Sequence, residues 1–412
     1  MAHYPNEREG AASCVSRRSF LFQAGRLTAA ATLLGLPLPF TERGFGAEPG
    51  PAPDAGYNKD RLKEKLIVRT ASPLNQETPL ELLNTWITPN DLHFVRNHYD
   101  VPQVDLQTWK LVVDGEVDRP LTLTIEDLKE FEAVTAVRTL ECAGNGRSFF
   151  SPKATGTQWG AGAVGTARYV GVRLADVLTR AGIRSRGKHV MFNGADEPVL
   201  PSAPDFIRSI PLEKALHPDT FLVHTMNGEP LPALHGYPLR VIPAGWVGSA
   251  CVKWLVNIRV LAQPYDGHFM VKSYRMPRSY AAPGAQVDPK DMVSLTSLEV
   301  KSLITAPVND ATVAPGRVIV RGAAWGGEAD IAKVEVSTDF GRTWHSARLG
   351  MDEARYAWRL WEFGWEISEP GSYLLMSRAT DVEGRTQPIE QIWNPSGYLW
   401  NVIPRVRINV KG

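Results

Sequence analysis

The sequence predicts an α+β protein in which a mixed α/β domain precedes a β-sandwich. Its 412 residues exceed one ordinary core and indicate two domains. Residues 57–290 mix strand-like and helix-like segments, whereas residues 291–412 hold short alternating runs typical of a sandwich. A hydrophobic content of 43% is sufficient for globular packing.

The first domain is expected to combine strands with short helices. Residues 110–113 and 134–140 are predicted strands because they are rich in Val, Thr and Leu. Residues 124–131 predict a short helix capped by Thr124, with Asp127 at its third position. Residues 172–181 predict a second helix that ends at Gly182.

The second domain is expected to be all strand. Its predicted strands cover residues 317–321, 331–337, 357–363, 372–379 and 405–410. Core and interface aromatics are expected at Trp325, Trp344, Trp358, Trp361 and Trp365. The segment 337–344 matches an Asp-box hairpin, but the match occurs once, which favours a tight hairpin in a sandwich over a propeller.

The charge balance limits the classes of partner. Lys and Arg number 45 against 44 Asp and Glu, so no basic excess is available for nucleic acid or anionic lipid. Small anions remain possible through local arginines. Cys14, Cys142 and Cys251 are too few for a disulfide framework, and no Cys-x-x-Cys-His motif is present, so no c-type haem is expected on this chain.

The amino-terminal region reads as a removable leader. Residues 16–21 are Ser-Arg-Arg-Ser-Phe-Leu, and an apolar stretch over 27–40 follows. This pattern resembles a twin-arginine export signal over residues 1–47, followed by a linker over 48–56. The apolar stretch is too short for a membrane span of about 20 residues. The resemblance implies periplasmic export with a cofactor inserted beforehand; the alternative is an amphipathic first helix.

One short motif offers metal chemistry. Thr-Leu-Glu-Cys-Ala-Gly-Asn-Gly-Arg-Ser over residues 139–148 places Cys142 where a predicted strand meets a glycine-rich turn. A thiolate at this place is a ligand for a soft metal. Taken alone, a cysteine in this setting is more often a small buried apolar residue than a ligand.

Four further clusters lie in the first domain. Residues 94–98 (Phe-Val-Arg-Asn-His) pair a cation with an imidazole two residues on. Residues 159–163 put a tryptophan before a flexible turn, and residues 235–240 join a histidine to an arginine across a turn. Residues 245–254 form a glycine-rich loop with a lysine, which suits a phosphate.

Together these clusters resemble the sulfite oxidase family of molybdopterin enzymes, from about residue 57 to the end. The resemblance implies a sulfite oxidase fold followed by an immunoglobulin-like dimerisation domain, and it implies a homodimer. It also implies that Cys142 binds the molybdenum of a molybdenum-molybdopterin cofactor. The cofactor-binding positions would be Arg96, Asn97, His98, Cys142, Asp196, His235, Arg240, Ser249 and Lys253. The catalytic positions would be Arg96, Cys142, Arg147, Trp159 and Tyr274.

Two departures from the family bear on the substrate. The haem domain of animal sulfite oxidases is absent from this sequence, and Ser396 stands where these enzymes place a further pocket arginine. The chain looks most like the molybdenum subunit of periplasmic sulfane (sulfite) dehydrogenases of Sox sulfur oxidation, which works with a separate c-type cytochrome. The implied substrate is sulfite, a small sulfur oxyanion, or sulfane sulfur on a sulfur-carrier protein.

Other readings of the same residues remain open. A periplasmic molybdopterin reductase of sulfoxides would use the same cofactor in the opposite direction. In a non-enzymatic immunoglobulin-like binding protein, the cysteine motif would serve packing only. Arg147 could also be a structural partner of Glu141.

Overall fold

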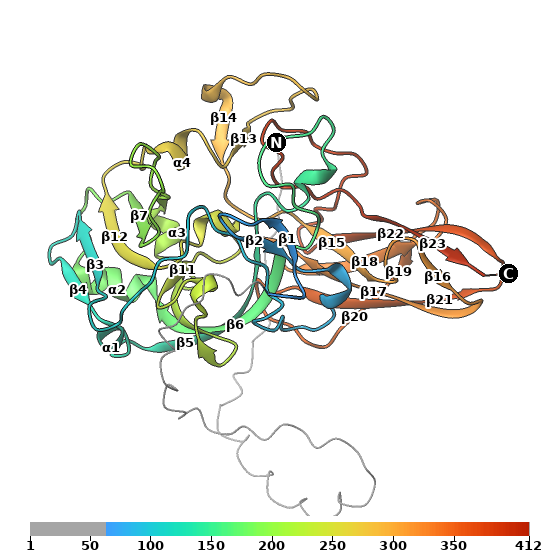
Figure 1. The fold of residues 1–412 in the computed structure, drawn as a ribbon, viewed down its shortest axis with the longest axis horizontal. Coiled ribbons are helices and arrows are strands. Elements are labelled where there is room, and N and C mark those ends of the chain that lie inside the picture. The colour runs from blue at the N-terminus through green and yellow to red at the C-terminus, as the bar shows by residue number, and fades with distance from the viewer. Residues whose placement is uncertain (1–62, 412) are drawn as a thin grey trace, which may run out of the picture. The chain divides into compact units, whose positions relative to one another are not determined.

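The computed structural model describes residues 63–411, and Figure 1 shows its fold. The predicted export signal and linker lie outside the described residues. Over 63–411, no helix is both long and apolar enough to cross a membrane. Among the described residues, strands predominate and α-helices are few, as in an α+β protein, and the predicted fold class is confirmed.

The first sheet positions the cysteine motif. Its strands are β5 (Ala133–Glu141), β6 (Val164–Arg173), β9 (Phe221–Met226), β10 (Glu229–Pro230) and β11 (Arg240–Ile242). The order is β10-β9-β6-β5, with β11 also paired to β9, and all pairs are antiparallel. The predicted strand at 134–140 is the middle of β5, so Cys142 follows the end of this edge strand.

A second, mixed sheet builds the opposite part of the domain. Its strands run in the order β4 (Leu121–Leu123), β3 (Leu111–Gly115), β12 (Leu255–Leu261), β7 (His189–Gly194) and β8 (Arg208–Pro211). Strands β3 and β12 are parallel, and the other pairs are antiparallel. Two small hairpins complete the strands: β1 (Ile67–Thr70) with β2 (Asn75–Glu77), and β13 (Arg275–Pro277) with β14 (Met292–Ser294).

The helices are short: α1 (Ile125–Leu128), α2 (Leu174–Ala181), α3 (Leu212–Ala215) and α4 (His268–Val271). Helix α1 has the predicted capping box, in which Thr124 and Asp127 bond each other's backbone N–H. Helix α2 starts at Leu174, two residues later than predicted. Val172 and Arg173 instead extend β6, where they pair with Leu222 and Phe221.

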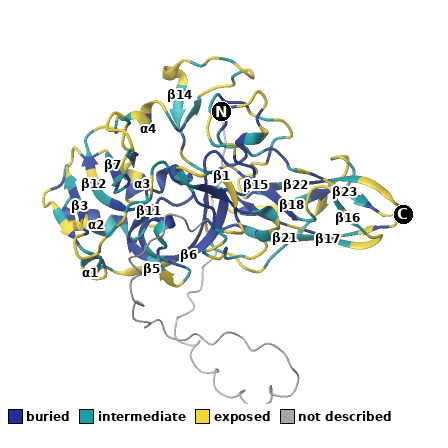
Figure 2. Cartoon of the chain, viewed as in Figure 1, coloured by how far each residue is buried: buried dark blue, intermediate teal, exposed yellow. Residues whose placement is uncertain are grey.

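The carboxyl-terminal half is a two-sheet sandwich. One sheet is β15 (Lys301–Ala306), β17 (Gly316–Trp325), β21 (Arg359–Ile367) and β20 (Arg348–Leu349). The other is β16 (Ala311–Val313), β23 (Arg405–Val410), β22 (Gly371–Asp381), β18 (Ile331–Ser337) and β19 (His345–Ser346). Buried side chains from both sheets form its core. Figure 2 colours the buried residues dark blue along the ribbon. The segment 337–344 links β18 to β19 as the predicted hairpin.

The tryptophans divide between core and partly exposed positions. Trp325, Trp358 and Trp361 are buried, whereas Trp344 and Trp365 are half-buried. Trp325 and Trp358 belong to a core cluster that also contains Leu111 and Leu174 of the first half of the chain. The hydrophobic core therefore continues from one half into the other.

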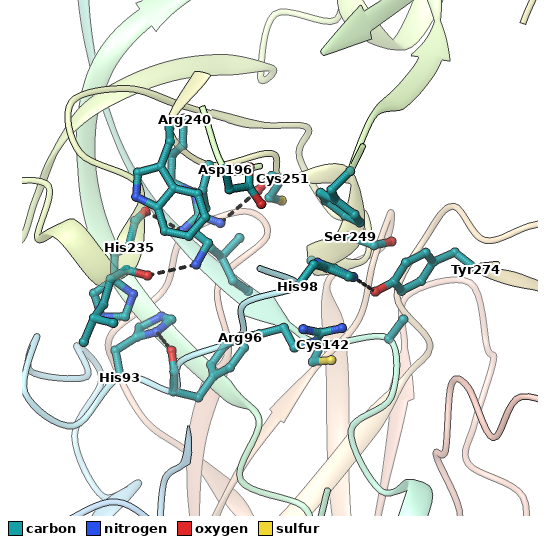
Figure 3. Close-up of a pocket in the computed structure, with 18 residues that line it drawn as sticks. His93, Arg96, His98, Cys142, Asp196, His235, Arg240, Ser249, Cys251 and Tyr274 are labelled. Atoms are coloured by element: carbon teal, nitrogen blue, oxygen red, sulfur yellow. Dashed lines mark hydrogen bonds between the residues drawn. The ribbon is translucent and has the colours of Figure 1, made fainter. Parts of the chain in front are cut away.

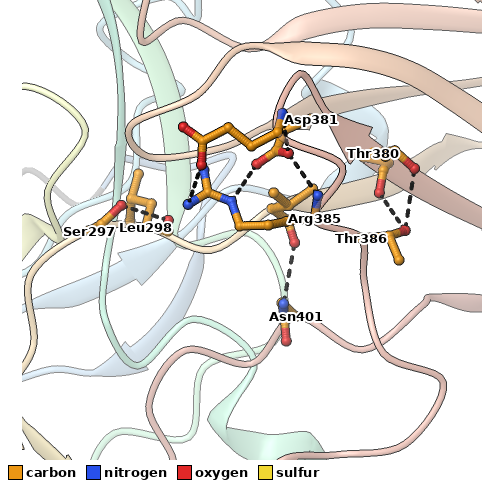
Figure 4. Close-up of polar contacts among 10 residues, drawn as sticks. Ser297, Leu298, Thr380, Asp381, Arg385, Thr386 and Asn401 are labelled. Atoms are coloured by element: carbon orange, nitrogen blue, oxygen red, sulfur yellow. Dashed lines mark hydrogen bonds and ion pairs between the residues drawn. The ribbon is translucent and has the colours of Figure 1, made fainter. Parts of the chain in front are cut away.

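Residues 382–404 connect β22 to β23 and are termed the C-terminal connection. It begins with a turn around buried Asp381, whose Oδ1 accepts the backbone N–H of Glu383 (3.0 Å) and Arg385 (2.9 Å), as Figure 4 shows. Arg385 also donates from Nε to Oδ2 of Asp381 at 2.7 Å. Buried Gln387 then accepts from the N–H of Ala379 at 2.9 Å. These bonds fix the root of a long loop that reaches the cysteine motif.

Candidate active site

The turn after β5 holds Cys142 rigidly. Its N–H donates to the carbonyl of Ala163 at 3.0 Å, and its carbonyl accepts from the N–H of Asn145 at 2.9 Å. The Asn145 side chain stabilises the turn with two hydrogen bonds. It donates to the Glu141 carboxylate at 2.8 Å and accepts from the Ala163 N–H at 3.0 Å. A Cβ on Gly248 would lie 2.9 Å from the Glu141 carbonyl, so the glycine lets the second loop approach this turn closely.

Cys142 opens into a cavity, shown in Figure 3. The cavity has about 690 Å³ of empty space, counting the part open to solvent. Nine of the predicted site residues line it: Arg96, His98, Cys142, Asp196, His235, Arg240, Ser249, Lys253 and Tyr274. Segments that are distant in the sequence therefore converge on one place.

The cavity is strongly cationic. Arg96, Arg240 and Lys253 line it, against a single carboxyl group, Asp196. Burial, followed by the charge of Arg240, holds the pKa of Lys253 well below its ordinary value. Burial also raises the pKa of Asp196 to about 6 despite the nearby Lys253 charge. Buried like charges need a counterion, so the cavity is suited to an anion.

Several buried polar atoms at the cavity have no hydrogen-bond partner among residues 63–411. They are Nε of Arg240, Oγ of Ser249, Nδ2 of Asn97 and Nε2 of His93. Leaving such an atom unpaired costs about 1–3 kcal/mol, so their gathering at one cavity favours a bound ligand. With the cations and the Cys142 thiol, this donor set fits a phosphate-bearing cofactor whose metal takes a cysteine ligand.

Backbone contacts preset two of the cations. Arg240 donates to the carbonyls of His235 at 3.0 Å and Cys251 at 3.2 Å. Lys253 donates to the Leu234 carbonyl at 3.0 Å and also to the side chain of Asn97. The predicted Asn97 does not itself line the cavity, but its side chain accepts from Lys253, which does.

Tyr274 and His98 form a hydrogen-bonded pair at the other side of the cavity. The Tyr274 hydroxyl lies 2.5 Å from Nε2 of His98, as Figure 3 shows. The His98 ring stacks on Phe206, with 3.7 Å between centroids. Burial raises the pKa of Tyr274 to about 12 and, followed by the Arg96 charge, holds the pKa of His98 well below 6.5. At neutral pH both side chains are uncharged.

Arg147 and Trp159, also predicted at the site, lie outside the cavity lining. Arg147 donates to the carbonyls of Thr157 (3.0 Å) and Ser396 (2.9 Å), and its guanidinium lies 4.9 Å from the ring centroid of Tyr398. Trp159 is fully buried in the same apolar cluster as Cys142. Glu141 does not pair with Arg147; it pairs with Lys301 at 2.8 Å.

The C-terminal connection completes this side of the site. The Leu399 N–H donates to the Ala143 carbonyl at 2.9 Å, and Tyr398 stacks on Tyr274 with 5.4 Å between centroids. Gly146 has a φ of +89°, and a Cβ there would lie 2.6 Å from Trp400. Glycine is therefore required where the two loops meet.

Sequence reasoning missed three residues at the site. His93 and Cys251 line the cavity, and Lys63 contacts His235 from behind. The sequence predicts no site role for Cys251; burial raises the pKa of its thiol to about 11, so this thiol stays protonated at neutral pH. His93 adjoins the Phe94 motif, which is the one local signal that could have found it.

Comparison with known proteins defines the class. The family described as oxidoreductase molybdopterin binding domain matches residues 98–269, and the Mo-co oxidoreductase dimerisation domain matches residues 292–411. Mitochondrial sulfite oxidase of Rattus norvegicus is 36% identical over 374 residues, covering 86% of this chain and 67% of that protein. Sulfite oxidase of Gallus gallus is 37% identical over 350 residues, covering 81% and 76%.

A solved structure supports the same assignment. The sulfane dehydrogenase SoxCD of Paracoccus pantotrophus matches with a TM-score of 0.73 and 29% identity, covering 90% of this chain and 96% of that one. The fold and the matched domains thus define a molybdopterin-binding oxidoreductase with a dimerisation domain. The chain belongs to the sulfite oxidase family.

Proposed function

We propose that this chain is an exported molybdenum enzyme that oxidises a sulfur centre and passes the electrons to a c-type cytochrome. The cavity carries the proposal: the Cys142 thiol, three desolvated cationic side chains and several unpaired polar atoms meet in a single pocket. Family membership supports the molybdenum cofactor and the sulfur chemistry. The twin-arginine pattern supports export, and the dimerisation domain supports a homodimer.

The residues divide into holding and reacting groups. Cys142 would ligate the metal, while Arg240, Ser249 and Lys253, together with Asn97 and His235, would hold the anionic tail of the cofactor. Asp196 would accept from donor groups of the pterin. The bound cofactor supplies two-electron oxo transfer to a substrate sulfur. Arg96 would hold the substrate oxygens with its planar fork, and the protonated Tyr274 hydroxyl would donate a hydrogen bond beside His98.

The surroundings of Arg147 bear on the substrate. Its Nε is engaged by the backbone carbonyl of Ser396, at the position where sulfite oxidases place a pocket arginine. One cation fewer weakens capture of the free dianion sulfite and leaves room for a longer sulfur-bearing arm. We therefore favour sulfane sulfur on a carrier cysteine as substrate, with Arg147 and buried Trp159 shaping the wall behind the site.

Steady-state kinetics on the cofactor-loaded protein test the function. Reduction of cytochrome c is measured with sulfite and, separately, with a carrier protein that bears a cysteine persulfide. Turnover with either substrate is expected, with the larger kcat/KM for the carrier. Purified protein that lacks molybdenum and pterin contradicts the proposal, as does turnover only as a sulfoxide reductase with a reduced dye.

A further inference from the structure

The Lys63 side chain lies outside the cavity lining and has three hydrogen-bond acceptors around its Nζ. Its Nζ lies 2.5 Å from the Asn90 carbonyl, 2.7 Å from the His93 carbonyl and 2.7 Å from Nε2 of His235. An ammonium group has three donors and no acceptor. Three acceptors surround this nitrogen, so the ammonium form of Lys63 is fully paired without any group of the cavity.

The chemistry of these partners selects a state of His235. Two of the three acceptors are carbonyls, so the third N–H of the ammonium is left for the lone pair on Nε2. Burial, followed by the charge of Lys63, holds the pKa of His235 well below 6.5, so the ring is neutral. A neutral imidazole whose Nε2 accepts carries its proton on Nδ1.

The remaining ring nitrogen is the one available to a ligand. His235 lines the cavity, and within residues 63–411 no hydrogen-bond partner meets its Nδ1. Arg240 and Lys253 line the same cavity as further donors. Resting on the proposed cofactor, we propose that Lys63 is a positioning residue: it fixes His235 as an Nδ1–H donor to the anionic part of the molybdopterin.

Lys63 is itself held by the protein. Its N–H donates to Oε1 of Gln76 at 3.3 Å, and Nε2 of Gln76 donates back to the Lys63 carbonyl at 3.0 Å. Fully buried Gln76 exchanges backbone bonds with Val95, which belongs to the Phe94–His98 motif. This anchoring places the ammonium before any cofactor binds, which is how an outer residue tunes a ligand-holding histidine.

Two substitutions at Lys63 and one control test the role. Lys63→Met removes the donor, and Lys63→Arg keeps a cation that can donate to Nε2. The matched control is Lys65→Met, two residues on. Lys65 is exposed, and its ion pair with exposed Asp91 is long, at 4.0 Å. Molybdenum and pterin per chain are measured after expression in a host that makes the cofactor. The protonated ring nitrogen of His235 is identified by ¹⁵N NMR of histidine-labelled protein, assigned with His235→Gln.

Below pH 7, where Lys63 carries its proton, the wild-type protein should show His235 protonated on Nδ1. Lys63→Met should lower cofactor affinity by about 10- to 100-fold, which is typical of an outer-sphere partner. It should also shift the nitrogen signals of His235. Lys63→Arg should restore part of the cofactor affinity and part of the wild-type signals. Lys65→Met should change neither the affinity nor the signals. A wild-type His235 protonated on Nε2 overturns the inference whether or not the variants fold. Wild-type protein without pterin would instead sink the proposed function.

Discussion

Cys142 and Cys251 present two thiols to one cavity, but their surroundings differ. Cys142 follows the end of a strand beside a glycine turn, whereas Cys251 is buried deeply enough to raise its pKa to about 11. A thiol with such a pKa is a poor metal ligand, since only the thiolate binds. The cavity therefore distinguishes two residues that composition alone treats alike.

Cys142→Ser should abolish turnover and leave the fold intact, because a hard hydroxyl replaces a soft ligand of similar size. Pterin should still bind through the cationic side of the cavity. Cys251→Ser is the matched control and should retain most of the turnover. Activity, pterin content and far-UV circular dichroism are measured together. Wild-type turnover with full metal occupancy in Cys142→Ser would show that another group ligates the metal.

Ser396→Arg should act oppositely on the two candidate substrates. A second cation beside Arg147 should raise kcat/KM for free sulfite, by about tenfold for a contact worth about 1.5 kcal/mol. It should lower kcat/KM for the carrier, because the longer side chain obstructs the arm. Ser396→Gln adds bulk without charge and should lower carrier use without helping sulfite. Unchanged rates with both substrates would remove the support for a carrier-bound substrate.

Lys63 also predicts a pH dependence of stability in the cofactor-free protein. Burial lowers its pKa to about 7 in the fold, against an ordinary 10.5 in the unfolded chain. Between these values the unfolded state binds the additional proton, so stability rises with pH. This contribution is complete above about 10.5 and is lost as pH falls through 7. Urea unfolding from pH 7 to 10 should show a steeper rise for wild type than for Lys63→Met; parallel curves would contradict the shift.

At the level of elements, strand β5 does more than carry the cysteine motif. Its last residue, Glu141, accepts from Asn145 of the turn and, at 2.8 Å each, from Lys301 of β15 and Trp325 of β17. Both Glu141 and Lys301 are buried. One carboxylate thus ties the strand end before Cys142 to the sandwich.

Glu141→Gln should destabilise the protein by about 3–5 kcal/mol, because it leaves the buried Lys301 ammonium without its counterion. Adding Lys301→Met should recover much of that loss. Urea denaturation provides the measurement. Glu126→Gln is the control: it breaks an exposed pair with Lys129 on α1 and should cost less than about 0.5 kcal/mol. Should the Glu141 variant match this control, the buried pair is not a structural tie.

Elements that depend on local sequence patterns were predicted well. Site residues that depend on contacts between distant parts of the chain were predicted less well. Strands β18 and β23 follow their predicted ranges because alternation is a local signal. Helix α2 begins late because pairing with β9, some fifty residues on, kept Val172 in a strand. Lys63 was missed for a similar reason: its partner His235 is 172 residues away, and no motif marks a lysine that acts through another side chain.

At the scale of the whole molecule, residues 292–411 match a dimerisation domain. We expect a homodimer mediated by the sandwich. Sedimentation equilibrium at micromolar concentration should give twice the 45.4 kDa of the chain, less any leader removed. The cofactor-free protein should dimerise equally well, because the cavity lies in the other half of the chain. A monomer at this concentration would count against the expectation.

The C-terminal connection also imposes an order on how the site comes into being. Arg147 precedes Ser396 by 249 residues, so at about 5–20 residues per second the ribosome adds Ser396 roughly 12–50 s later. Throughout that interval the arginine has neither the Ser396 carbonyl nor the Tyr398 ring beside it. The first half of the chain can form its sheets while it is being made, but the C-terminal connection, which packs against Arg147 and Tyr274 outside the cavity lining, is made only after most of the sandwich strands. Maturation of the pocket is therefore tied to completion of the sandwich.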